Sequence, residues 1–313
     1  MENESTWTDI FFSGSCPKVF EKSELPITSF RPFSPEDPNW NIGPQIDTFR
    51  RPDVNHIQVF WIRINGHRKY ITKVVSRHPS LMNQFTYLEV TLSQFPRYSK
   101  QDAKMKLFHL RILSTPERIV DASYEFDRFY REAQAYHQID LRCSPRERIY
   151  FPQFFGALTN IPEDRFFSGY PNERAVVLEA IQPRLCSRRI FGEDTTHLSK
   201  DFPAVFEAAA KELGDGMLSL SPFEQDWYRS LLKDRLRRVD ALHRIGVIHG
   251  DIHDLHFRLP NDIYDTVLYD FSESYTFSKK QPFQVYCGKP RSLTRISHCE
   301  REDVFFHIHD RWD

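Results

Sequence analysis

Glycine, cysteine and long apolar runs are scarce in this sequence of 313 residues. Only 11 residues are glycine, and Gly66 is the single glycine between positions 44 and 155, so that stretch holds no G-x-G-x-x-G loop. No run reaches the roughly 18 apolar residues of a membrane span, and the acidic residues 1–9 lack the apolar segment of a secretory signal. These absences argue against a membrane protein and against a secreted one.

Neither sign of charge dominates, and the spacing of the cysteines does not indicate disulfide bonds or a metal site. Lys and Arg number 42 against 43 Asp and Glu, which gives a net charge of -1 and no general field to hold nucleic acid or an anionic membrane. The five cysteines are scattered, odd in number and free of CxxC pairs, a pattern typical of reduced thiols. We therefore expect a cytoplasmic protein that holds any anionic ligand by local groups; the sequence carries no signal of an oligomeric state.

The first half of the chain has the pattern of a sheet-rich unit. Residues 1–45 are rich in Pro, Ser, Asn and Asp and predict an extended arm that docks through its aromatic side chains. Two β-rich runs flank Asn65-Gly66 within 56–75, the strongest short signal for a hairpin. Apolar residues three and four apart predict a helix over 121–139. Further strands are expected at 85–95, 105–113, 151–158 and 174–181.

The second half has the pattern of helices. Residues 203–213 and 227–246 predict two of them, and Gly246 stands at the end of the second as a stop signal. A loop at 247–257 and a strand at 266–274 follow, and no helix series is evident after that strand. We predict an α+β fold with a sheet-rich first lobe and a helical second lobe. The expected parts are an extended arm at 1–45, an N-lobe at 46–181 and a C-lobe at 182–313.

Three short segments carry the residues of a chemical site: YITKVV at 70–75, VIHGDIHDLHF at 247–257 and TVLYDFSES at 266–274. Their order resembles the protein-kinase-like fold, most closely its aminoglycoside-phosphotransferase and choline-kinase-like branch and fungal kinase-like proteins, where HGD replaces the HRD of ordinary protein kinases. The resemblance covers roughly residues 50 to 280, and IHGDIH and LYDFS are its specific motifs. It implies a bilobal fold with a β-rich N-lobe and a truncated helical C-lobe.

The resemblance also implies roles for individual residues. Asp251 would orient the acceptor hydroxyl and take its proton, and Asp270 would hold Mg²⁺ against the phosphates of ATP, because that hard ion prefers carboxylate oxygen. Lys73 would pair with the phosphates, and Glu132 of the helix would hold that lysine in place. The alternatives for this ion pair are Lys106 and Glu125.

Further residues complete the implied site. His249 would anchor the catalytic loop, and His253 matches the histidine two residues beyond the catalytic aspartate in the phosphotransferase branch. Glu179 would lie at the hinge between the lobes, near 179–183, where the nucleotide binds. The expected catalytic residues are thus Asp251, His249 and His253, the nucleotide-binding residues Lys73, Glu132 and Glu179, and the metal-binding residues Asp270 and His256.

The chain departs from the family pattern in three places. His256 stands where the family places a second metal-binding Asn; since imidazole is a poor Mg²⁺ ligand, this position binds no metal, favours a softer ion such as Mn²⁺, or packs structurally. Without a glycine-rich loop, ATP would be held loosely or differently. No APE motif follows Ser272, so a platform for peptide substrates is not expected.

These departures leave more than one function open. We expect an atypical phosphotransferase that uses ATP and Mg²⁺ or Mn²⁺ on a small-molecule hydroxyl; a pseudokinase or repurposed scaffold, with the arm filling the cleft, is the alternative. A zinc hydrolase is a third hypothesis, because His249 and His253 are four residues apart and His256 is three further on. Gly250 within the segment favours a loop over a helical zinc face. The expected partners are a nucleotide and a small-molecule substrate, with no nucleic acid and no membrane.

Overall fold

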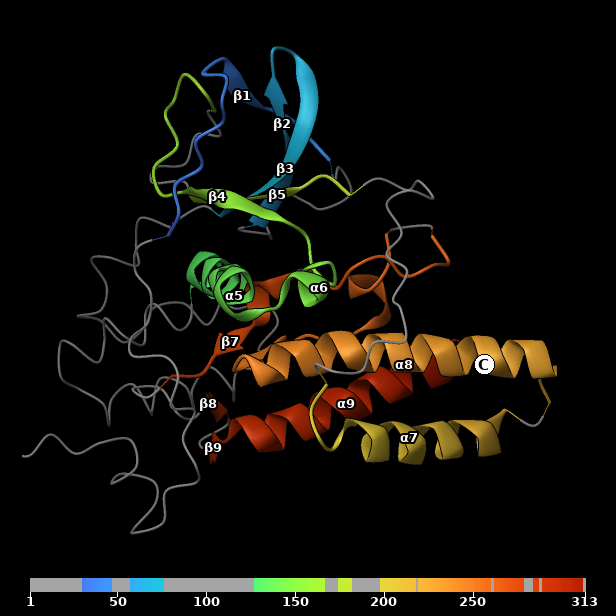
Figure 1. Cartoon of the computed structure of the whole chain (residues 1–313). Coiled ribbons are helices and arrows are strands. Elements are labelled where there is room, and N and C mark those ends of the chain that lie inside the picture. The colour runs from blue at the N-terminus through green and yellow to red at the C-terminus, as the bar shows by residue number, and fades with distance from the viewer. Residues whose placement is uncertain are drawn as a thin grey trace, which may run out of the picture.

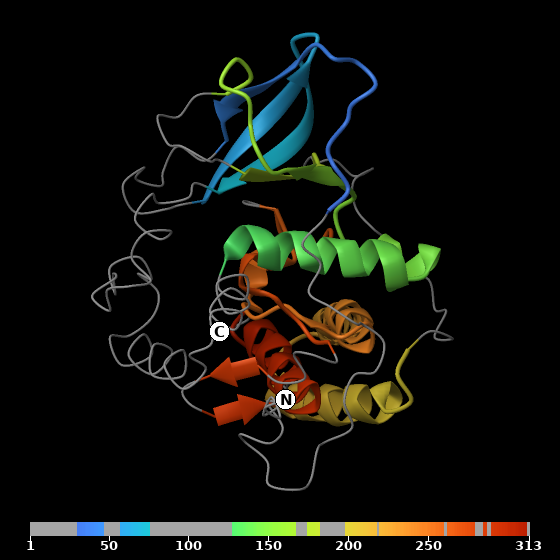
Figure 2. The same ribbon diagram turned by 90° about the vertical axis from the view of Figure 1, so that its left-hand side faces the viewer.

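The computed structural model describes residues 30–46, 57–75, 127–166, 174–181, 198–217, 219–259, 262–278, 284–286 and 289–311. They form a mixed α+β structure with an antiparallel sheet in the N-terminal part and helices in the C-terminal part, as the sequence predicted (Figure 1). Helix α5, Arg128–Arg142, crosses between the sheet and the remaining long helices (Figure 2). This arrangement agrees with the expected protein-kinase-like fold of two lobes.

Five antiparallel strands in the order β1-β2-β3-β5-β4 make up the sheet. Asn65 and Gly66 join β2 to β3 with φ angles of 51° and 79°, the left-handed turn that an Asn-Gly pair predicts. The central strand β3 pairs Lys73 with Val59 on one side and with Val176 on the other. The strands are β1 Trp40–Gln45, β2 Ile57–Ile64, β3 His67–Val75, β4 Phe154–Leu158 and β5 Arg174–Glu179.

The expected arm overlaps with the sheet. Residues 40–45 form strand β1, whereas the part of the arm just before it lies along β4, where the backbone N–H of Phe33 donates to Ala157 O at 3.0 Å. Phe33 is buried and packs edge-on against Trp40, so this contact uses the aromatic side chains that the sequence marked. Residues 1–29 lie outside the described part of the chain, as do the strands expected at 85–95 and 105–113.

The alternation of side chains along β3 sends Lys73 toward α5. Val75, two residues further on, packs in the same buried cluster as Phe129 and Ala133 of α5, while Val74 packs on the opposite face of the sheet. Because side chains in a strand point alternately to its two faces, Lys73 shares the face of Val75. The strand thus places a lysine beneath the sheet, next to the helix.

Helix α5 starts later than its apolar pattern suggests and ends later as well. Asp127 is its N-cap, and its carboxylate accepts from Phe129 N at 3.0 Å and Tyr130 N at 3.4 Å, which satisfies two of the free N–H groups of the first turn. The buried face includes Glu132 and Tyr136. The predicted helix is therefore present, at 128–142 instead of 121–139.

The helical part is larger than the sequence indicated. Helix α9, Leu293–His309, packs against α8 although no helix was expected after Ser272, so that expectation was wrong. Helix α8 begins at Pro222, five residues before the predicted start, because Ser221 and Glu224 form a capping box. The other elements are α6 Pro145–Arg148, α7 Phe202–Gly216, α8 Pro222–Arg244, β6 Val247–Ile248, η3 Asp254–His256, η4 Phe271–Glu273, β7 Tyr275–Thr276, β8 Gln284–Tyr286 and β9 Lys289–Arg291.

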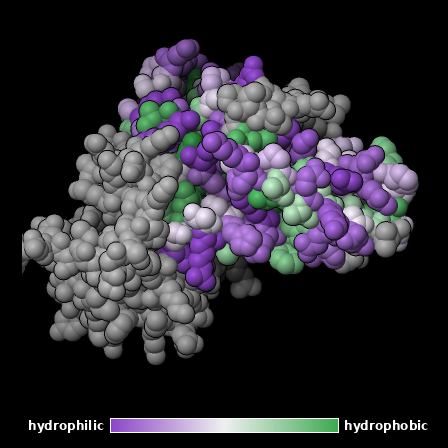
Figure 3. All heavy atoms as spheres, turned by 60° about the horizontal axis from the view of Figure 1, so that its bottom comes forward, coloured by the Kyte–Doolittle hydropathy of each residue, from purple (hydrophilic) through white to green (hydrophobic). Residues whose placement is uncertain are grey.

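The surface of the helical part is mixed in character. On the face shown in Figure 3, hydrophobic residues lie in small groups among hydrophilic ones. The described helices include none whose length and apolar character would let it cross a bilayer.

Candidate functional site

The predicted ion pair between Lys73 and Glu132 is present, and Asp270 joins it. Lys73 Nζ lies 2.9 Å from Glu132 Oε1 and 2.7 Å from Asp270 Oδ1. The three residues come from β3, from α5 and from the segment after Val267, so they are brought together by the fold and not by proximity in sequence. Lys106 and Glu125, the alternatives for the pair, lie outside the described residues.

Burial sets the electrostatics of these three groups. Burial on its own would lower the pKa of Lys73, but the charges of Asp270 and Glu132 outweigh it and the pKa is raised. Burial likewise opposes the ionised form of Asp270, yet Lys73 and then His256 hold the pKa of that carboxyl well below its usual range. For Glu132, which has no exposed surface, burial is the larger effect and its pKa is raised. Lys73 and Asp270 are therefore a charged pair at neutral pH.

Asp270 has a backbone conformation that its surroundings hold in place. Its φ of 68° and ψ of 68° lie in the left-handed region, which costs a non-glycine residue of order 1–3 kcal/mol. Ser272 Oγ donates to Asp270 Oδ1 at 2.8 Å, and the next residue, Glu273, pairs with Arg131 of α5 at 2.9 Å. The prediction of a strand at 266–274 was wrong: residues 266–270 form no strand, and the chain turns at Asp270 into η4. This turn directs the Asp270 carboxylate toward Lys73.

His256 connects the two aspartates that the sequence singled out. Its Nδ1 lies 2.7 Å from the backbone oxygen of Asp251, and its Nε2 lies 3.5 Å from Asp270 Oδ2. A carbonyl oxygen only accepts, so Nδ1 carries a proton and donates it to Asp251. His256 therefore has a structural contact with the loop, and its Nε2 is directed at the Asp270 carboxylate.

His249 is buried and its side chain is part of the loop's framework. Its Nε2 lies 2.9 Å from Tyr269 O, which ties the loop to the residue before Asp270. Burial, followed by the neighbouring His256, lowers the pKa of His249 to about 4. The ring is neutral at pH 7, in line with the expected anchoring role.

The lowered pKa of His249 predicts a loss of stability in mild acid. The unfolded chain binds a proton on this ring near pH 6.5, whereas the folded protein does so only near pH 4. The free energy of unfolding should therefore fall on going from pH 7 to pH 5, by roughly 2 kcal/mol from this group. Urea unfolding in the presence of a chelator measures it: His249→Asn should remove that contribution, while the exposed control His298→Asn should keep it. An unchanged pH dependence in His249→Asn would contradict the assignment.

Glycine is required at position 250 by the close approach of another backbone segment. Gly250 has a φ of 79°, and a Cβ placed there would lie 2.1 Å from Glu273 O. Its N–H donates to Glu300 Oε1 at 2.6 Å, and the other oxygen of Glu300 lies 2.7 Å from His243 Nε2. Helix α9 thus holds the loop in front of Asp251 through one buried carboxylate, a contact that sequence analysis missed together with the helix.

Gly250→Ala should be far more harmful than the same change at Gly66. Both residues have a φ of 79°, but nothing lies within 4 Å of a Cβ at position 66. Gly66→Ala should therefore cost only the backbone strain, about 1–2 kcal/mol, whereas Gly250→Ala must also displace the backbone of Glu273. We expect Gly250→Ala to lower the free energy of unfolding by at least ~2 kcal/mol more than Gly66→Ala in urea unfolding. Equal losses would show that the close approach is absent.

Asp251, His253 and Glu179 are partly exposed to solvent. Asp251 and His253 each have side chains 32% exposed, and His253 Nε2 lies 3.9 Å from Asp251 Oδ2. Glu179 ends β5, and its carboxylate accepts from Gln153 N at 3.1 Å. Seven of the predicted site residues form one connected set: Lys73, Glu132, Asp270, His256, Asp251, His249 and His253. Glu179 lies outside this set and has contacts of its own. The roles of all eight residues in binding and catalysis stay predictions.

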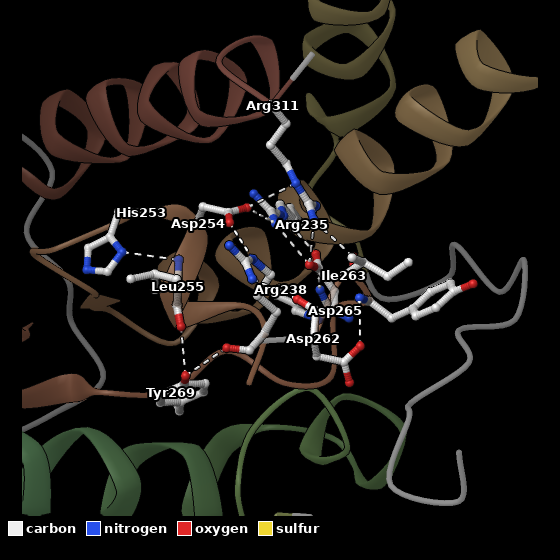
Figure 4. A network of polar contacts seen from close by, with 12 residues as sticks. Arg235, Arg238, His253, Asp254, Leu255, Asp262, Ile263, Asp265, Tyr269 and Arg311 are labelled. Carbon is white, nitrogen blue, oxygen red and sulfur yellow. Dashed lines mark hydrogen bonds and ion pairs between the residues drawn. The ribbon is translucent and has the colours of Figure 1, made fainter. Parts of the chain in front are cut away.

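A buried ionic cluster fixes the far side of the loop (Figure 4). Arg235 of α8, whose side chain is fully buried, contacts Asp254 at 2.6 Å and Asp265 at 2.7 Å. Arg311 reaches Asp254 from the end of α9 at 3.5 Å. Because Asp254 directly follows His253, the cluster determines where the residues after Asp251 lie. The sequence held a signal for it: Arg235 is three residues after Leu232 and four before Val239 on the apolar face of α8.

Comparison with known proteins finds a likeness among solved structures and none by sequence. No family model matches the sequence, and no curated protein matches it. Among solved structures, the chain is similar to PK-1, the kinase of the Cydia pomonella granulovirus, with 10% sequence identity and a TM-score of 0.33 over 76% of this chain and 55% of that one. The chain thus spans about half the length of the viral kinase.

Proposed function

We propose that this protein transfers the terminal phosphoryl group of ATP to the hydroxyl group of a small molecule. The observation that supports the proposal best is the lysine held between two carboxylates, Lys73 with Glu132 and Asp270. Burying a lysine is costly unless it is paired, and a structural pair needs only one partner. The second carboxylate, on the segment next to the loop of Asp251, suits a lysine positioned to bind phosphate.

The lysine has the capacity to bind a phosphate group as well as its partners. An ammonium group has three N–H donors, and Glu132 and Asp270 take two of them. The third is available for a phosphate oxygen. Since no glycine-rich loop is encoded before β3, we expect Lys73 to supply a larger share of the phosphate contacts than it would beside such a loop.

The residues around Asp270 also fit a divalent ion. Asp270 Oδ2 and His256 Nε2 lie 3.5 Å apart, close to the separation of two ligands of one ion with metal–ligand distances near ~2.1 Å. One nitrogen and one oxygen suit Mn²⁺ better than Mg²⁺. Such an ion would neutralise charge on the phosphates. Asp251, a partly exposed carboxylate in the same loop, would accept the proton of the hydroxyl.

A small acceptor is favoured over a protein by the short connection after Asp270. Only residues 274–292, 19 positions, separate η4 from α9. Little chain is available there to form a surface for an extended peptide, and Tyr275 and Phe277 of that segment are buried in the core. The acceptor is therefore proposed to be a small hydroxyl compound.

Nucleotide and metal binding can be tested by thermal unfolding. Wild type titrated with ATP or ADP in the presence of Mn²⁺ should be stabilised, by about 2.7 kcal/mol at a ligand concentration 100 times Kd. Asp270→Asn should remove the dependence on metal, whereas the exposed control Asp164→Asn should not. If no nucleotide and metal stabilises wild type, the phosphotransferase proposal fails and the scaffold alternative is favoured.

The pseudokinase alternative is supported by one observation of its own. The chain encodes no glycine between 44 and 155 except Gly66, which lies in the β2–β3 turn. Weak phosphate binding is compatible with a protein that binds nucleotide without turning it over. Binding in the thermal experiment without consumption of ATP would distinguish this alternative from the enzyme.

A further inference from the structure

The catalytic loop brings together three groups that resemble the ligands of a transition metal. One ligand atom each from Asp251, His253 and His256 lies within 4.8 Å of the others. We propose that these residues form a transition-metal site that shares His256 with, and is an alternative to, the ion proposed between Asp270 and the phosphates. The site follows from the geometry of the loop and does not depend on phosphotransfer being the function.

The ligand set suits metals that accept nitrogen. Two imidazoles and one carboxylate are typical of Zn²⁺, Co²⁺ and Fe²⁺ sites, whereas Mg²⁺ prefers oxygen ligands throughout. With metal–ligand distances near ~2.1 Å, tetrahedral ligand atoms lie roughly 3.4 Å apart. The three atoms therefore need to approach each other by about 1.4 Å at most, which side-chain rotation of the partly exposed Asp251 and His253 can provide.

His256 is already oriented as a metal ligand needs to be. Its Nδ1–H donates to the backbone oxygen of Asp251 at 2.7 Å, so Nε2 is the ring nitrogen available to a metal ion. A ligating histidine in proteins usually donates its other N–H to a carbonyl or a carboxylate, which fixes the ring orientation. The ring is also nearly buried, with its side chain 9% exposed, so little conformational freedom is lost on binding.

His253 needs one hydrogen bond to change. Its Nδ1 accepts from Leu255 N at 3.2 Å, so Nε2 of the neutral ring carries the proton. Coordination through Nε2 moves that proton to Nδ1 and breaks the contact with Leu255. The hydrogen bond is solvent-exposed, so water can take the place of the imidazole and the loss is small. Coordination through Nδ1 breaks the same contact.

Occupation of this site has a direct consequence for the proposed reaction. Nε2 of His256 has one lone pair, so an ion held with His253 and Asp251 excludes an ion shared between His256 and Asp270. A coordinated Asp251 carboxylate also no longer accepts a proton. Metals that prefer nitrogen should thus inhibit phosphotransfer, if phosphotransfer is the function, while Mg²⁺ should not compete for this site.

Co²⁺ titration without nucleotide tests the site. Chelator-treated wild type should bind one equivalent with a visible d–d spectrum, and isothermal titration should give its Kd. His253→Ala and Asp251→Asn should each weaken binding by at least ~10-fold, since changes to groups that only support a ligand already cost that much. His298→Ala is the matched control, because His298 and Glu302 form an exposed pair four residues apart on α9 that could bind metal non-specifically.

Each outcome of the titration has a definite meaning. Loss of affinity in His253→Ala and Asp251→Asn, with Asp270→Asn and His298→Ala near wild type, supports the site. Loss of Co²⁺ affinity in Asp270→Asn but not in His253→Ala would place the ion between His256 and Asp270 and overturn the proposal. Loss of affinity in His298→Ala alone would overturn it too, as would the absence of stoichiometric binding by wild type. Circular dichroism of each variant checks its fold. Asp251 and His253 are both partly exposed, so neither substitution should disturb the fold, and each tests the site independently.

Discussion

Lys73→Met should lower the free energy of unfolding by about 3 kcal/mol or more, because it leaves the buried carboxylate of Glu132 and the partly buried carboxylate of Asp270 without their counter-charge. Methionine keeps most of the apolar volume of the lysine stem, so the loss reports the charge and not a cavity. Urea unfolding with a linear extrapolation gives the change.

Two further variants separate this effect from a general effect on β3. Lys69→Met, at an exposed position of the same strand beside the ring of Tyr70, should change stability by less than about 1 kcal/mol. The double variant Lys73→Met/Glu132→Gln should be more stable than the sum of its single changes, since removing both charges leaves less unpaired charge buried. Additive losses would show that Lys73 and Glu132 do not interact in solution.

Asp251→Asn should reduce ATP consumption by roughly a hundredfold or more while leaving nucleotide binding intact. Asparagine keeps the shape of the side chain and removes the base, and the Asp251 backbone oxygen still accepts from His256. The assay measures ADP formed by chelator-treated protein supplied with Mn²⁺ or Mg²⁺ and a set of small hydroxyl compounds. Asp262→Asn, a change on the far side of the buried ionic cluster, is the control and should retain activity. Equal rates in wild type and Asp251→Asn would show that this carboxylate is not the base.

The hairpin and the ion pair could be predicted because their signals are local. Asn65-Gly66 encodes a left-handed turn by itself, and Glu132 lies among apolar residues at helical spacing, where a carboxylate needs a partner. Lys73 and Asp270 could be assigned only through the motifs around them. Nothing in local spacing says that β3 and η4 meet on one side of α5.

The missed features depend on contacts that the chain makes at long range. Helix α9 buries Ser297 and Glu300 along with Ile296 and Val304, so its inner face is partly polar and its periodicity is weak in the sequence. Glu300 is buried because it serves Gly250 and His243, and those partners are known only from the fold. The position of His256 was likewise open, since a packing residue and a metal ligand have the same sequence signature there.

Formation of a phosphate ester is the most direct test of the proposed function. Phosphorus NMR of wild type with ATP, Mn²⁺ and the hydroxyl compounds should show the terminal phosphate signal of ATP replaced by that of a new ester together with ADP, and Asp251→Asn should not produce the ester. If wild type is stabilised by ATP and metal yet forms neither ester nor ADP, the protein binds nucleotide without transferring phosphate, and the account of Asp251 as a base is contradicted.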